Sequence, residues 1–113
     1  MTNAEERFAR LVEEFSGQPG VEAPGGSSRR RFGSETLKVN GSIFAMITGG
    51  RLVVKLPADR VRSLIGSGTG APFGTGKRSP MREWVTVVDQ DDATWTALAR
   101  EALDYVRSRR SGA

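Results

Sequence analysis

The stretch 32–56 holds three short apolar runs that are separated by two pairs of turn-forming residues. These pairs, Asn40-Gly41 and Gly49-Gly50, supply the positive φ angles that two-residue hairpin loops require. The pattern therefore predicts an antiparallel β-meander. The strands that follow from it are 36–39, 42–48 and 51–56, with further strand candidates at 29–32 and 82–88.

Side chains alternate in direction along a strand, so each strand can be divided between two faces of the sheet. In 51–56 the alternation is strict and leaves one face wet. In 42–48 three apolar residues share one side, whereas Phe44 and Met46 occupy the other. Either this strand is covered on both faces, or Phe44 and Met46 lie on an apolar patch that a partner covers. We expect loops or a helix to cover them.

Helical spacing of apolar residues marks three other segments, at about 3–15, 57–65 and 92–108. Pro57 suits the first turn of the middle helix, and Gly66 is expected to end it. Asp91 or Asp92 is the expected N-cap of the last helix. Hairpins with helices at the ends predict an α+β fold: a two-layer domain with four to five antiparallel strands in the order α-β(3-4)-α-β-α.

The glycine-rich stretch 66–80 invites comparison with a phosphate-binding loop. A Walker A motif needs Gly-x4-Gly-Lys-Ser/Thr after a strand, but here Ala71 replaces the first Gly and Arg78 replaces the Ser/Thr. The residues before the stretch are also predicted to be helical. Nucleotide binding is therefore not expected, and the stretch is predicted to be a long loop.

The composition of the chain bounds its number of domains and excludes several kinds of catalytic and metal-binding site. The 113 residues, 37% of them hydrophobic, suit one domain over 1–113, with a flexible basic tail at 107–113. The absence of Cys and His removes thiol nucleophiles, imidazole bases and the usual zinc ligands. The acidic N-terminal segment does not resemble a signal peptide, and a cytoplasmic protein is expected. We predict no enzyme activity, no catalytic residues, no cofactor and no bound metal.

Charge is segregated along the chain, whose formal net charge is +4. Residues 28–82 contain eleven Lys or Arg but only Glu35 and Asp59 as acids, whereas the segments on either side are acidic up to residue 106. One interpretation is a basic surface for nucleic acid. The alternative is an arginine-rich surface that acidic helices balance in space.

Several segments form a recognisable series along the chain. These segments are Phe32-Gly33, Leu37-Lys38-Val39-Asn40-Gly41, Ile43-Phe44-Ala45, Arg51-Leu52-Val53-Val54-Lys55-Leu56, Pro72-Phe73 and Pro80-Met81-Arg82-Glu83-Trp84-Val85. In their order and spacing, the chain resembles the N-terminal domain family of the competence regulator TfoX (Sxy) and is similar to the neighbouring MmcQ/YjbR group. The resemblance spans nearly the whole chain, from the Pro19-Gly20-Val21 loop through the final helix. It implies a two-layer α+β domain like that of secretion chaperones, in a bacterial protein, and a DNA-binding or regulatory role.

Two functions follow as hypotheses. The first is a nucleic-acid-associated or transcription-regulatory domain that contacts phosphates through basic side chains, with low sequence specificity. The residues proposed for it are Arg29, Arg30, Arg31, Lys38, Arg51, Lys55, Lys77, Arg78 and Arg82. The alternative is a protein-interaction module or homodimer that uses an apolar sheet face. Its proposed anchors are Phe44, Met46 and Trp84.

Overall fold

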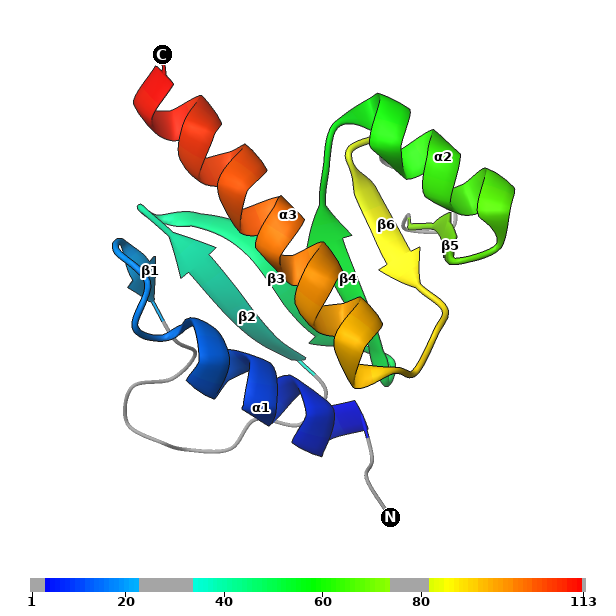
Figure 1. Ribbon diagram of the computed structural model, residues 1–113, viewed down its shortest axis with the longest axis horizontal. Helices are drawn as coiled ribbons and strands as arrows, with labels where there is room; N and C mark the ends of the chain where they lie inside the picture. The colour runs from blue at the N-terminus through cyan, green and yellow to red at the C-terminus, as the bar shows by residue number, and fades with distance from the viewer. Residues whose placement is uncertain (1–3, 23–33, 74–81, 113) are drawn as a thin grey trace.

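The computed structural model describes residues 4–22, 34–73 and 82–112, which form an α+β domain with one antiparallel sheet and three helices (Figure 1). The helices are α1 (Ala4–Phe15), α2 (Ala58–Ser67) and α3 (Asp92–Gly112). The strands are β1 (Val21–Glu22), β2 (Ser34–Val39), β3 (Ser42–Thr48), β4 (Arg51–Lys55), β5 (Gly70–Pro72) and β6 (Trp84–Val87). None of the helices, over the described residues, is long and apolar enough to cross a membrane.

Both predicted hairpin turns are present. Asn40 and Gly41 have φ values of 52° and 86°, and Gly49 and Gly50 have φ values of 61° and 79°. These left-handed pairs connect β2 to β3 and β3 to β4 with two-residue loops. The predicted meander is therefore confirmed as the centre of the sheet.

The described sheet has six strands in the order β1-β2-β3-β4-β6-β5, one more than the upper limit of the prediction. The short edge strand β5 lies in the stretch 66–80, which was predicted to be a loop, and β1 lies in a stretch for which no strand was predicted. β1 pairs with β2 through Val21 and Val39, and β5 pairs with β6 through Gly70 and Val87. Strands this short, with glycine and proline in or beside them, have no apolar pattern that would predict them. Their formation depends on pairing with a neighbouring strand. The strand predicted at 29–32 lies outside the described residues.

A β-bulge changes the direction of side chains in β3. Leu37 pairs with Ala45, but the next residue of β2, Lys38, pairs with Ile43, so Phe44 is an extra residue on β3. Phe44 therefore turns to the same side as Ala45 and is fully buried, with its ring 6.2 Å from that of Phe15 in α1. The prediction that Phe44 and Met46 share a face is wrong, because strict alternation does not hold across a bulge.

All three helices pack on one face of the sheet. The hydrophobic core combines residues of α1, α2 and α3 with the strand positions that alternate toward them, including Leu52 and Val54 of β4 and Val85 and Val87 of β6. In Figure 1 α3 crosses the middle strands, α1 lies beside β2, and α2 lies beside β6 and β5. Trp95 of α3 is fully buried and donates a hydrogen bond from Nε1 to the Asp89 carbonyl oxygen at 2.7 Å.

Helix ends differ in part from the predictions. α2 continues past Gly66 to Ser67, and Gly68 caps its C-terminal end with a left-handed φ of 88°. The Asp91 carboxylate accepts a hydrogen bond from the Thr94 backbone N–H at 3.0 Å, which makes Asp91 the N-cap of α3, one of the two residues predicted. The segment predicted as a flexible tail from residue 107 is helical as far as Gly112.

Candidate functional site

The second face of the sheet carries no helix among the described residues, and we call it the helix-free face. Register and alternation define its members across the four longest strands. Thr36, Met46, Val53 and Thr86 form a row across its middle, because each is the cross-strand partner of the next. The other members are Lys38, Ile43, Thr48, Arg51, Lys55 and Trp84.

Three of the predicted basic residues come together on the helix-free face. Arg51 and Lys55 lie four residues apart on β4, which corresponds to about 13 Å along the strand. Lys38 lies two strands away from Lys55, at about 10 Å across the sheet. Arg51 is exposed, and the two lysines are partly buried. The three cations therefore outline a patch about 13 Å by 10 Å in size.

The patch has little negative charge near it. No carboxylate belongs to the helix-free face at the described positions of β2, β3, β4 and β6. Glu22 of β1 is the cross-strand partner of Lys38 at one margin. Among the side chains that the structure describes, none forms an ion pair with Lys38, Arg51 or Lys55.

The helix layer contrasts with this face, because its described arginine side chains are paired with acids of the same or a neighbouring helix. Arg7 and Arg10 of α1 both donate to Asp92 of α3, at 2.7 and 2.9 Å. Arg60 of α2 donates two hydrogen bonds of 2.9 Å to the carboxylate of Glu101 in α3. These contacts tie α1 and α2 to α3 and neutralise most of the charge between them.

Two pKa shifts accompany the helix-layer pairs. Hydrogen bonds from Arg7 and then Arg10 lower the pKa of Asp92 below its usual value. A hydrogen bond to Glu101 raises the pKa of Arg60, so this guanidinium stays charged. Both shifts arise mainly from the ion pairs that join the helices.

Apolar and aromatic groups occupy the rest of the helix-free face. Val53 is fully buried although it is not part of the core, and Met46 and Thr86 flank it in the same row. Trp84 is partly buried, with its ring centroid 6.5 Å from that of Phe73 and 5.7 Å from Nζ of Lys55. The face thus combines cations with one partly accessible indole ring.

The predicted site residues divide into four groups. Lys38, Arg51, Lys55, Met46 and Trp84 share the helix-free face, whereas Phe44 is a core residue. Arg82 is exposed just before β6. The structure does not describe the other predicted basic residues, Arg29, Arg30, Arg31, Lys77 and Arg78. Sequence reasoning did not assign Thr36, Thr48 and Thr86 to the site, although the period of two in their strands would place them there.

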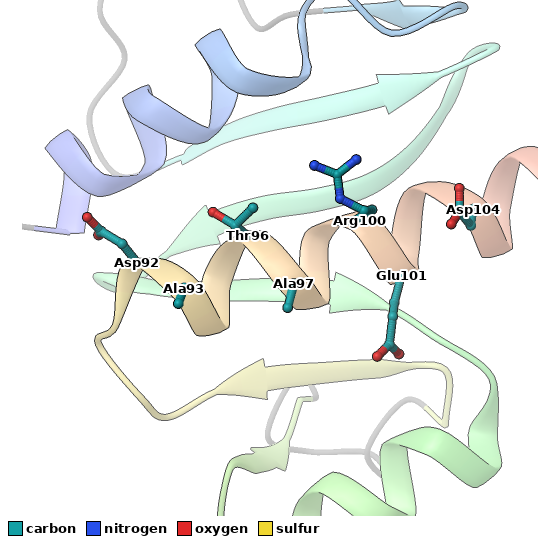
Figure 2. A pocket seen from close by; sticks show the side chains of 7 residues that line it. All are labelled: Asp92, Ala93, Thr96, Ala97, Arg100, Glu101 and Asp104. Carbon is teal, nitrogen blue, oxygen red and sulfur yellow. The ribbon is translucent and has the colours of Figure 1, made fainter.

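A shallow trough of about 620 Å³ runs along the outer side of α3 (Figure 2). The small side chains of Ala93 and Ala97 line it together with charged side chains of α3. Asp92, Arg100 and Glu101 along its margins are all engaged in ion pairs with α1 or α2. The trough therefore offers little free charge. Within residues 4–22, 34–73 and 82–112, no group of three acidic side chains is arranged to hold a metal ion.

Comparison of the chain with protein-family models, with curated proteins and with solved structures gave no match. The resemblance to the TfoX N-terminal domain stays a prediction that rests on the segments quoted for it. The geometry of the helix-free face is the main observation on which a function can be argued.

Proposed function

We propose that the domain associates with nucleic acid through the helix-free face. The observation that carries the proposal is the contrast in charge between the two layers. Among the described side chains, Lys38, Arg51 and Lys55 form no ion pair, whereas the arginines of the helix layer are paired with carboxylates. Phosphates of a nucleic acid strand are the anions that such a distributed patch suits.

The size of the patch is compatible with this partner. Successive phosphates of one strand in a duplex are about 3.4 Å apart along the axis, so a distance of about 13 Å spans about four of them. The threonines of the face add hydroxyl groups that can donate hydrogen bonds to phosphate oxygens. No described helix projects from this face to read a groove, so the proposed binding is electrostatic and low in sequence specificity.

Trp84 favours single-stranded nucleic acid over a duplex as the preferred partner. Its indole is partly accessible on the same face as the cations, and an unpaired base can stack on such a ring. The bases of a duplex are already stacked on each other. We therefore expect a labelled single strand of about 20 nucleotides to bind more tightly than the corresponding duplex.

The proposal is tested by fluorescence anisotropy with both nucleic acids at several salt concentrations. We expect binding at about 50 mM salt and a log–log salt slope of about −2 for the single strand, which corresponds to three phosphate contacts. The triple variant Lys38→Gln, Arg51→Gln, Lys55→Gln should lose at least about tenfold in affinity and flatten the slope.

A matched control removes the same number of positive charges from the helix layer through Arg10→Gln, Arg100→Gln and Arg107→Gln. This control should bind nearly as well as the unaltered chain. Equal losses in the two triple variants would mean that net charge alone attracts the nucleic acid, and no binding at about 50 mM salt would remove the proposal.

The alternative, a protein-interaction module, loses its strongest anchor because Phe44 lies in the core. Met46 and Trp84 are its remaining anchors, and both are partly buried. Sedimentation of the chain over a range of concentrations tests the homodimer form of this alternative. A dimer that Met46→Ser and Trp84→Ser both weaken would favour it over nucleic-acid binding.

A further inference from the structure

A separate cavity of about 310 Å³ lies between α2 and the edge of the sheet formed by β5 and β6. Its described apolar walls are Ala58, Val61 and Ile65 of α2, Pro72 at the end of β5, and Trp84 of β6. β5 ends at Pro72, which pairs with Val85, so Trp84 lies at the margin of the sheet where its side chain reaches the cavity.

The polar groups of this cavity are of one kind. Arg62 and Arg82 are its described charged members, and no described carboxylate lines it. Arg62 forms an ion pair with Asp59, which lies one turn earlier in α2. Arg82 is exposed and makes no ion pair with another residue that the structure describes. An apolar hollow with an unpaired cation at its rim suits a ligand with an apolar body and an anionic end.

We propose that this cavity binds a small apolar anion, a hydrocarbon chain of about ten carbons that ends in a carboxylate or phosphate group. The chain lies against Ile65, Pro72 and Trp84, and the anionic end meets Arg82. A volume near the lower end of the range for ligand sites limits the ligand to about a dozen non-hydrogen atoms. Trp84 belongs both to this cavity and to the helix-free face, but Lys38, Arg51 and Lys55 do not line the cavity. The test with small anions therefore does not depend on nucleic-acid binding.

Trp84 provides a reporter inside the proposed site. The two tryptophans of the chain differ in environment, because Trp95 is fully buried in the core and Trp84 is partly buried against the cavity. A ligand in the cavity should therefore change the fluorescence of Trp84 and leave that of Trp95 nearly constant. The Trp84→Phe variant should lack the change while calorimetry still detects binding.

The experiment titrates the full chain with hexanoate, octanoate and decanoate below their micelle concentrations. Each added CH₂ group that is buried should raise the affinity about threefold to fourfold. Decanol, which has the same chain and no charge, should bind about fivefold more weakly than decanoate. Decyl phosphate in place of decanoate tells which anionic end the site prefers.

Two variants locate the ligand. Arg82→Gln is an exposed change that should weaken decanoate about fivefold without affecting decanol. Ala58→Leu fills the cavity and should abolish binding of both, with the circular dichroism spectrum as the check of folding. Arg10→Gln, an equal loss of charge on the far helix α1, should change nothing.

Three results would overturn the proposal. They are the absence of saturable binding for all the probes, equal affinity of decanoate and decanol, and an unchanged decanoate affinity in Arg82→Gln. Loss of nucleic-acid binding in the Lys38, Arg51 and Lys55 variant, with decanoate binding intact, would show that the two sites are independent.

Discussion

The Asp92 carboxylate accepts hydrogen bonds from two arginines of α1, Arg7 and Arg10. These bonds lower its pKa in the folded chain relative to the unfolded chain. The stability that Asp92 contributes is therefore complete above the usual pKa of an aspartate, about 3.9, and is lost as the pH falls through the lower folded value.

In urea unfolding, the variant Asp92→Asn should be less stable than the unaltered chain at pH 7. The difference between their free energies of unfolding should shrink as the pH falls below about 4. A difference that stays constant between pH 7 and pH 2.5 would mean that the charge of Asp92 does not act through these arginines.

Asp91 has a different role from its neighbour, since it caps the backbone of α3 at Thr94. Asp91→Ala should lower the free energy of unfolding by about 1 kcal/mol, because a helix N-terminal donor loses its acceptor. Asp89→Ala is the matched control, because the Trp95 indole binds the backbone carbonyl of Asp89 and not its side chain. Urea midpoints measured at pH 7 compare the two variants, and equal losses would contradict the capping role.

At the scale of elements, the bulge in β3 decides which apolar residues stabilise the fold. Phe44 is fully buried and Met46 is partly buried on the opposite face. Phe44→Ala should cost about 3–5 kcal/mol, the usual range for a buried phenylalanine, and Met46→Ala should cost roughly half of that or less. Chemical denaturation of both variants checks the order, and equal costs would argue against the bulge.

The sequence was informative for elements with a local signal. Asn40-Gly41 and Gly49-Gly50 predict hairpins because only a few residues adopt their φ angles easily, and Phe8, Leu11 and Phe15 predict α1 from their spacing. The bulge could not be predicted, because no turn residue or periodicity marks the pairing of Lys38 with Ile43 that places Phe44 beside Phe15. The end of α2 was misplaced since Gly66 and Gly68 look alike in sequence, while only Gly68 has a positive φ.

For the whole molecule, the segregation of charge along the sequence becomes in part a segregation between layers. Arg60 belongs to the basic stretch 28–82, yet the Glu101 carboxylate in the helix layer neutralises its charge. Lys38, Arg51 and Lys55 belong to the same stretch and lie on the opposite face, where they form no ion pair with a described side chain. Charge counting therefore predicted the candidate patch only in part, because it cannot tell which cations a helix will neutralise.

The cavity beside α2 could not be predicted from the sequence, because its residues are distant from one another along the chain. Ile65, Pro72 and Trp84 come from three elements, and Arg82 lies in the turn that precedes β6, so only their tertiary arrangement brings them together. In the sequence Arg82 and Trp84 were assigned to different hypotheses. Their joint position at the margin of the sheet links an apolar wall to a cation.

The bulge also has a consequence for chain length. Leu37 pairs with Ala45 and Lys38 with Ile43, so Phe44 has no partner on β2. Deleting this one residue would leave both pairs and the Asn40-Gly41 turn in place, and it would convert the ladder into a regular one. A related chain that is shorter by one residue here would keep the same hairpin, and it would need a larger side chain elsewhere to fill the space beside Phe15.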